Sequence, residues 1–237
     1  MSDLERALAR VPEAPAHVIP RGMLLRATPA LLGSVARGSF GIHDARRATL
    51  ALIGDPPPTD CLPTPVPRVA FAVSERFDPQ AWPIFRWETL DVFISDDRHR
   101  APPAVDVELL ASTFPVADAS ADLRFALEIG LALGPVFAAR SVGNVVAAAC
   151  CFWRSERYFD ISIDTLPAHR HRGLGYAVAV ALLNALRPAR AVHCSSPDET
   201  RARDFIRALG FRRVGAIWRG VPDVKPSSMN GPASESG

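Results

Sequence analysis

A short loop rich in arginine and glycine is the part of this sequence best suited to chemistry. Its residues, Arg170 to Gly175, read RHRGLG and connect an alternating segment, 158–165, to an apolar segment, 176–186. A helix N-terminus presents unpaired N–H groups and a partial positive charge, and glycine lets a phosphate approach the backbone. The loop therefore predicts an anion site, in particular one for a diphosphate. The alternative is an ordinary strand-to-helix turn whose glycines allow tight packing.

Two familiar phosphate-binding motifs do not fit this loop. The P-loop requires a lysine after its last glycine, and the only lysine of the chain is Lys225. The dinucleotide fingerprint requires a small residue three positions after Gly175, where the sequence has Val178. The sequence therefore disfavours a mononucleotide kinase and a nicotinamide-dependent enzyme.

The segments around the loop indicate how it is positioned. Residues 158–165 alternate, so that Asp160 and Asp164 point to one face of a single predicted strand and Ile163 to the other. A capping box at Ser196–Glu199 predicts the start of a later helix. Alternating helices and strands predict a mixed α/β sheet with helices packed on it. The remaining predicted helices are 107–114, 121–133 and 176–186, and the remaining strands are 136–140, 145–153, 189–194 and 211–218.

The chain divides into three predicted regions. Residues 1–103 read as an α+β region of unknown role, with helices at 4–10 and 43–53 and a proline-rich connector at 56–67. Residues 104–220 carry the α/β pattern. Residues 221–237 are small and polar and predict a disordered tail.

Composition excludes several classes of protein. The chain has 237 residues, 48% of them hydrophobic, so it can bury a core without disulfides or metal. Its four cysteines form no C-x-x-C pair, which disfavours a disulfide scaffold and a zinc knuckle. A net charge of +2 argues against a dedicated nucleic-acid binder. No apolar run approaches the ~20 residues of a membrane span, and no targeting signal is visible, so we expect a cytoplasmic protein.

The pattern [QR]-x-x-G-x-[GA] on a strand–loop–helix unit is typical of one family. In its phrases ISIDT, HRHRGLG, AVALL and RALGF, at residues 161–165, 169–175, 179–183 and 207–211, the chain resembles the GNAT superfamily of N-acetyltransferases. The resemblance covers residues 104–219 and is strongest to the branch of larger members with an extra N-terminal region. It implies a mixed central sheet flanked by helices, with an N-terminal α+β extension.

The resemblance also implies how a co-substrate, acetyl-CoA or another acyl-CoA, would bind. Backbone groups of residues 163–165 would pair with the pantetheine arm, and amides of residues 171–176 would bind the pyrophosphate. The acyl group would lie between the strand ending at Thr165 and the strand ending at Cys194, which splay apart in this family. No metal is expected. The implied binding residues are Ile163, Asp164, Thr165, Arg170, His171, Arg172, Gly173, Leu174, Gly175 and Tyr176.

The candidates for catalysis are less regular. Where the family often has an asparagine and a tyrosine on its second helix, this chain has Glu199 and Ile206. Asp160 is the candidate general base, with Asp164 next on the same face, and Tyr176 is a candidate proton donor. The alternatives are that Asp160 lies on a solvated strand face and that Tyr176 packs at the helix start. His193 and Cys194 are further candidates, although Cys194 lacks a visible activating base.

The implied function is an acetyl-CoA-dependent N-acetyltransferase. An acyl group would move to a primary amine of a small molecule by direct attack of the amine on the thioester. Two alternatives stay open: a non-catalytic acyl-CoA-binding or regulatory module, and a protein N-acetyltransferase. The sequence identifies neither the acceptor nor the oligomeric state, and a homodimer is one option.

Overall fold

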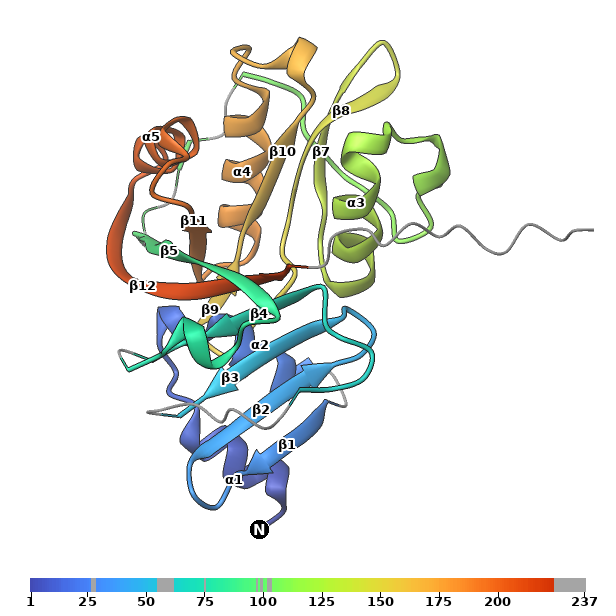
Figure 1. Ribbon diagram of the computed structural model, residues 1–237. Helices are drawn as coiled ribbons and strands as arrows, with labels where there is room; N and C mark the ends of the chain where they lie inside the picture. Colours follow the sequence, from blue (N-terminus) through green and yellow to red (C-terminus); the bar gives the residue numbers. More distant parts are fainter. Residues whose placement is uncertain are drawn as a thin grey trace, which may run out of the picture.

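The computed structural model describes residues 1–26, 29–54, 62–74, 76–96, 98, 100, 101 and 104–223 (Figure 1). Five α-helices lie in these ranges: α1 (Asp3–Arg10), α2 (Val18–Arg26), α3 (Ala121–Leu133), α4 (Leu174–Ala185) and α5 (Thr200–Ala208). Half of the proline-rich connector, residues 56–61, and nearly all of the predicted tail lie outside the described residues.

The strands form two sheets. The larger has eight strands in the order β1-β2-β3-β4-β12-β5-β11-β9, and the smaller has four in the order β10-β8-β7-β6. The first five strands are β1 (Ala30–Ser34), β2 (Ser39–Asp44), β3 (Thr49–Ile53), β4 (Val69–Ala72) and β5 (Phe85–Ser95). The others are β6 (Glu108–Leu109), β7 (Phe137–Ser141), β8 (Asn144–Cys150), β9 (Tyr158–Asp160), β10 (Ser162–Thr165), β11 (Arg190–Ser195) and β12 (Phe211–Pro222).

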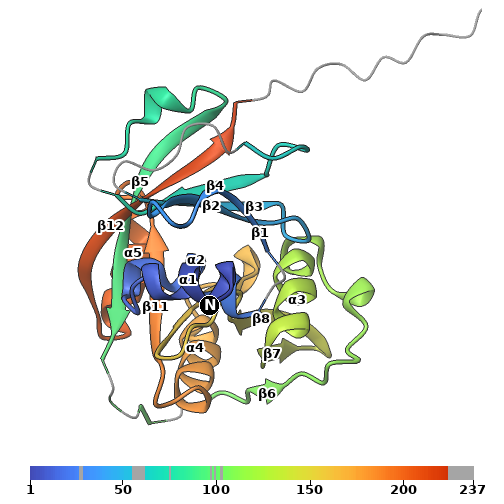
Figure 2. The same ribbon diagram turned by 90° about the horizontal axis from the view of Figure 1, so that it is seen from below.

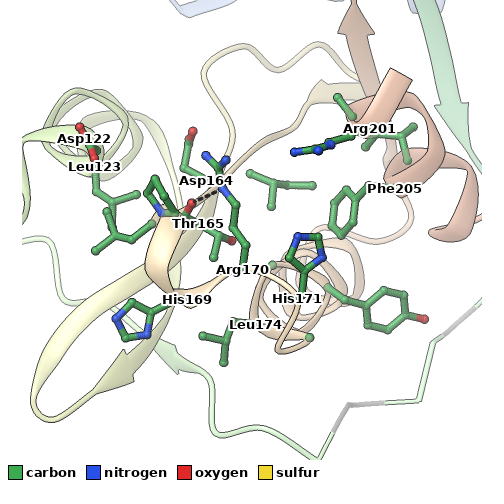
Figure 3. Close-up of a pocket in the computed structure, with 18 of the residues that line it drawn as sticks. Asp122, Leu123, Asp164, Thr165, His169, Arg170, His171, Leu174, Arg201 and Phe205 are labelled. Atoms are coloured by element: carbon green, nitrogen blue, oxygen red, sulfur yellow. Dashed lines mark hydrogen bonds between the residues drawn. The ribbon is translucent and has the colours of Figure 1, made fainter. Parts of the chain in front are cut away.

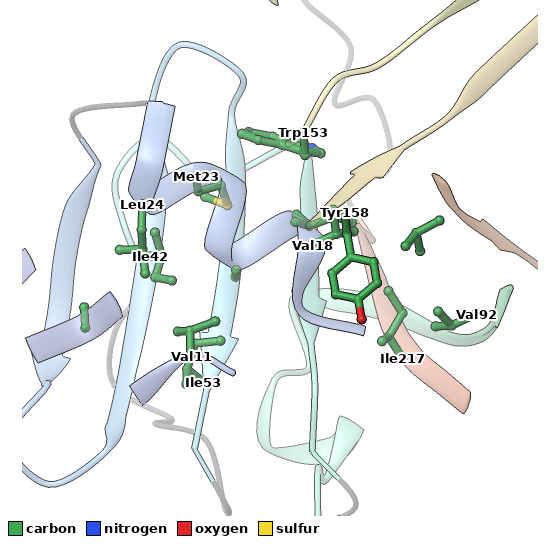
Figure 4. Close-up of a cluster of buried hydrophobic side chains, with 14 of the residues drawn as sticks. Val11, Val18, Met23, Leu24, Ile42, Ile53, Val92, Trp153, Tyr158 and Ile217 are labelled. Atoms are coloured by element: carbon green, nitrogen blue, oxygen red, sulfur yellow. The ribbon is translucent and has the colours of Figure 1, made fainter. Parts of the chain in front are cut away.

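The N-terminal helices cover one face of the larger sheet. In Figure 2, α1 and α2 lie beneath strands β1 to β4. Figure 4 shows Val18 and Met23 of α2 in one apolar cluster with Ile42 of β2 and with Trp153 and Tyr158, which lie on either side of the chain's turn into β9. Burial of this apolar surface, worth about 25 cal/mol per Å², joins the first 100 residues to the rest of the molecule.

The smaller sheet is covered on both faces. Alternate residues of β8 point to opposite sides, so Ala147 and Ala149 contact the α4 cluster while Ala148 and Cys150 contact the α3 cluster. Small side chains on both faces let the two helices approach the sheet closely. α3 therefore lies on one side of β10 and α4 on the other.

The predicted single strand 158–165 is in fact two strands in different sheets. β9 pairs in parallel with β11, and β10 pairs antiparallel with β8. The change of partner occurs at Ile161, whose N–H still donates to the carbonyl of Val192 at 2.9 Å. Beyond this residue β10 and β11 diverge, which is the splay that the family resemblance implied.

Three other local predictions were wrong. Residues 43–53 form the end of β2 and all of β3 rather than a helix, with a turn begun by Asp44, whose carboxylate accepts from the N–H of Arg46 at 3.0 Å. Residues 107–114 contain only the edge strand β6. α5 begins at Thr200 after Glu199, with no side-chain cap, so the predicted capping box does not form. Short apolar runs fit both periodicities, which explains the first two errors.

The predicted fold class is confirmed: the molecule is mixed α/β, with a large mixed sheet flanked by helices. The division into regions at residue 104 stays a prediction. β5 precedes that boundary in the sequence, yet it lies in the larger sheet between β12 and β11.

Candidate functional site

A pocket of about 820 Å³ opens where β10 and β11 separate (Figure 3). This volume is within the usual range for small-molecule sites, which is roughly 300–1,000 Å³. β10, the loop that follows it and the first turn of α4 supply most of the lining. The other elements contribute Asp122 and Leu123 from α3, His193 from β11, and Arg201, Ala202, Phe205 and Ile206 from α5.

The edge of β10 that faces this pocket has no partner strand among the described residues. The N–H of Leu166 donates to the carbonyl of Val146 at 2.9 Å, and the register pairs Asp164 with Ala148. Because successive backbone groups of a strand point in opposite directions, those of Ile163 and Thr165 point away from β8 and toward the gap. Asp164 therefore uses its backbone in the sheet and its side chain in the pocket.

The start of α4 forms a second row of donors. Gly173 is the N-cap residue, and no side chain caps the helix within the described part of the chain. Its φ of +75° lies in the left-handed region, which explains why the position suits glycine. The first-turn N–H groups of Leu174, Gly175 and Tyr176 have no acceptor within the helix, and all three residues line the pocket.

Close packing, rather than backbone conformation, explains why residue 175 is a glycine. A Cβ at this position would lie 2.9 Å from Oγ1 of Thr165 and 3.7 Å from Cζ of Phe205. The start of α4 therefore approaches β10 and α5 too closely for a side chain. The two glycines of the loop thus serve a backbone conformation and a close approach, which are separate requirements.

The pocket lining carries both basic and acidic side chains. Arg170 and His171 of the loop and Arg201 of α5 are basic, whereas Asp122 of α3 and Asp164 of β10 provide carboxylates (Figure 3). The Nε of Arg170 donates to the carbonyl of Thr165 at 3.2 Å. Burial raises the pKa of Asp164, and a hydrogen bond from the Ser162 hydroxyl partly offsets this rise. The lining therefore offers groups for an anion and groups for a cation, and Arg170 lies against β10, the strand that carries Asp164.

The structure brings most of the predicted binding residues together. Nine of the ten line the pocket, from Ile163, Asp164 and Thr165 on β10 to the loop and first turn of α4. Arg172 is exposed and does not line it. Their role in binding an acyl-CoA stays a prediction.

Asp160, the predicted base, lies outside the pocket lining. One of its carboxylate oxygens, Oδ1, accepts from the N–H of Phe152 at 2.8 Å and from that of Trp153 at 2.6 Å. These bonds take the place of strand pairing where β8 ends, so Asp160 stabilises the point at which the two sheets separate. Burial raises its pKa to about 7, although the two N–H donors act in the opposite direction.

The other catalytic candidates have different surroundings. Tyr176 is exposed and lines the pocket in the first turn of α4. Cys194 does not line it, and burial raises the pKa of its thiol to about 12, which disfavours a thiolate nucleophile. His193 does line it. The roles of Asp160 and Tyr176 stay predictions.

Sequence reasoning missed the lining residues of α3 and α5. Phe205 lies on the helix predicted after Glu199, and it is half-buried at the pocket wall. Asp122 and Arg201 are exposed charges on helices, with no local signal of a site. Only the packing of α3 and α5 beside β10 identifies them.

The described ranges lack two further features. They contain no group of three or more side chains placed to bind a metal ion. They also contain no helix with the length and hydropathy needed to cross a membrane.

Comparison with known proteins agrees with this geometry. Residues 128–216 match the family model for GNAT acetyltransferase. A GCN5-related N-acetyltransferase-like protein from Streptococcus suis is similar in structure, with a TM-score of 0.72 and 16% identity over 93% of this chain and 98% of that one. A putative GNAT acetyltransferase from Novosphingobium aromaticivorans has a TM-score of 0.56 and 18% identity, over 93% and 97% of the two chains. Among curated proteins, none matches the sequence. The family resemblance drawn from the loop is therefore confirmed, and it rests on the match of residues 128–216 to the GNAT acetyltransferase family model.

Proposed function

We propose that the protein transfers an acetyl group from acetyl-CoA to a primary amine of a small, cationic molecule. The observation that carries this proposal is the joining, in one pocket, of the free edge of β10 with the uncapped start of α4. An extended pantetheine arm can pair with Ile163 and Thr165 as an added strand. The pyrophosphate suits the N–H groups that follow Gly173, because anions bind favourably at helix N-termini.

Two carboxylates in the pocket lining support a cationic acceptor. Asp122 lies on α3 and Asp164 on β10. A protonated amine would be attracted to these carboxylates, lose a proton, and attack the thioester carbon as a neutral amine. Asp160 is one candidate base for that proton: its pKa of about 7 is near the optimum for proton transfer at neutral pH, but it lies outside the pocket lining.

Calorimetric titration of CoA into three proteins tests the binding half of the proposal. Gly173→Asp places a carboxylate among the amides, and Gly143→Asp is its matched control in the β7–β8 turn. Both glycines have positive φ, +75° and +81°, and neither has an atom within 4 Å of an added Cβ. We expect Gly173→Asp to weaken CoA binding at least tenfold and Gly143→Asp to leave it unchanged. Absence of CoA binding to the unaltered protein would refute the proposal.

The reaction itself is tested by thiol release from acetyl-CoA. The acceptor panel is cadaverine, tryptamine and a lysine-containing peptide, which separates small amines from protein acceptors. Turnover with a small cationic amine is the expected result. The alternative is a non-catalytic acyl-CoA-binding module. It is favoured by Ile206, which is buried at the pocket wall and has no ionisable group that could act as an acid. CoA binding without any turnover would support that alternative.

A further inference from the structure

His193 is an ionisable side chain in the pocket that the proposed function does not yet use. It lies on β11, two residues before the strand ends and opposite the divergence of β10. Its Nδ1 is 3.3 Å from the carbonyl oxygen of Ile161, the residue at which the strands part. Its Nε2 is buried and has no hydrogen-bond partner among the described residues. A buried polar atom without a partner is uncommon in folded proteins and calls for an explanation.

The contact with Ile161 determines which ring nitrogen carries the proton. A carbonyl oxygen can only accept, so the neutral ring places its hydrogen on Nδ1. Nε2 then has a free lone pair and is the nitrogen able to accept a proton. The backbone of the splay point thus orients the imidazole, as a second group commonly does for a catalytic histidine.

The surroundings favour the neutral ring. Burial, the largest influence, lowers the pKa of His193, while the Ile161 carbonyl and the charge of Glu199 act in the opposite direction. The other charged or titratable groups around the pocket are Asp122 on α3, Asp164 on β10, Tyr176 on α4, Arg201 on α5, and His169, Arg170 and His171 in the loop. A neutral imidazole at pH 7 is ready to take a proton and to return it.

We propose that His193 carries the proton that the attacking amine loses and delivers it to the sulfur of CoA. This inference rests on the proposed function. The amine nitrogen forms a bond to the acyl carbon and transfers its proton to Nε2. The carbon–sulfur bond then breaks, and the imidazolium gives the same proton to the departing thiolate. The products are an amide and CoA thiol, and His193 ends neutral, as it began.

The neighbouring helix supplies no carboxyl, hydroxyl, thiol or imidazole group to the pocket. The α5 residues that line it are Arg201, Ala202, Phe205 and Ile206. Tyr176 lies in the first turn of α4, where the N–H groups suited to the pyrophosphate are found. A single imidazole at the splay point serves both the amine and the sulfur, whereas Asp160 is bonded to the backbone of Phe152 and Trp153.

Nitrogen NMR of the histidine-labelled protein tests the proposal without any acceptor. The resonances of His193 are assigned by their loss in His193→Asn. We expect a hydrogen on Nδ1, a bare Nε2, and a pKa below 6.5 in the free protein. CoA should shift the Nε2 signal, because the thiol reaches it, whereas desulfo-CoA, which lacks the sulfur, should not. His171 in the loop should respond to both ligands and so reports binding.

The outcomes separate this inference from the proposed function. If neither ligand moves any signal, CoA does not bind and the proposed function fails. If both move His171 and CoA leaves His193 unchanged, the nucleotide binds but the proton-carrier role is overturned. The same conclusion follows if Nε2 carries the hydrogen in the free protein.

Kinetics supply a second readout, with the fastest amine of the panel. Asn at position 193 can still donate to the Ile161 carbonyl but cannot carry a proton. We expect His193→Asn to bind CoA within twofold of the unaltered protein while kcat falls about 10²- to 10⁴-fold. The kcat of the unaltered protein should fall as pH drops through the lowered pKa of His193. The His193→Asn variant should lack this acidic decline in its kcat–pH profile. A full kcat in His193→Asn, with a large loss in Asp160→Asn, would assign the proton to Asp160 instead.

Discussion

Replacing Asp160 by asparagine should stabilise the protein at alkaline pH. Both backbone N–H groups that bond to this side chain, from Phe152 and Trp153, reach the same oxygen, Oδ1. The amide oxygen of asparagine can accept both, so the substitution removes the charge and keeps the contacts. Burial raises the pKa of the Asp160 carboxyl group from 3.8 to about 7. The free-energy cost of ionising this group in the folded protein is therefore absent from the asparagine variant.

The sign follows from proton binding. Between about pH 4 and pH 7 the folded protein keeps a proton on Asp160 that the unfolded chain has lost. The free energy of unfolding therefore falls as pH rises through this window, by about 1.4 kcal/mol per pH unit, and the loss is complete above pH 7. From pH 5 to pH 7 the loss amounts to about 3 kcal/mol at most, since Asp160 is only half-buried and water reduces it.

Urea denaturation at pH 5, 6, 7 and 8 measures this difference. We expect the stability of Asp160→Asn relative to the unaltered protein to grow with pH up to 7 and then to stay constant. Asp198→Asn, at an exposed position, is the control and should show no such trend. Parallel pH curves for Asp160→Asn and the unaltered protein would refute the reasoning, because they would mean that Asp160 ionises normally in the folded state.

Two further substitutions test the supports of the pocket. Gly175→Ala should weaken CoA binding several-fold in calorimetry, because its Cβ would lie 2.9 Å from Oγ1 of Thr165 and force α4 away from β10. An unchanged affinity would mean that the close approach of α4 is not needed for binding. Asp91→Asn should lower the free energy of unfolding by about 3 kcal/mol in urea, since this buried carboxylate on β5 pairs with Arg203 of α5 and with Arg213 of β12. Asp204→Asn, which breaks an exposed pair, is its control and should cost less than about 1 kcal/mol; equal effects would contradict the argument from burial.

The loop and the helix after it could be predicted because their signals are local. The backbone at position 173 is left-handed, which favours glycine, and the apolar run after it has the length of one buried helix. Each of these features can be recognised from residues that are adjacent in the sequence. The same holds for the β7–β8 hairpin, whose turn at Ser141–Asn144 contains a glycine with positive φ.

The division of residues 158–165 into two strands could not be predicted. Alternation records which face each side chain occupies, and it continues unbroken through Ile161. It carries no information on the partner strand, which changes from β11 to β8 at that residue. The free edge of β10, and hence the pocket, arises from this change of partner.

The contrast between Asp160 and His193 has the same origin. From sequence both are polar residues on predicted strands, and both are candidates for catalysis. In the fold, Asp160 bonds to the backbone at the end of β8, while His193 lines the pocket with one nitrogen unpaired. Only long-range packing distinguishes the two roles: Asp160 stabilises the point where the strands diverge, and His193 faces the pocket between them.

The position of β11 links the unassigned first region to this chemistry. β5 lies between β12 and β11, and Phe93 of β5 is the register partner both of His193 and of Arg213. β9 borders β11 on its other side, but their pairing ends at Val192, one residue before His193. From that point on, only β5 fixes the path of β11 within the sheet. The residue that faces the splay is therefore positioned by a strand from the first 100 residues, so the N-terminal region is part of the architecture of the site.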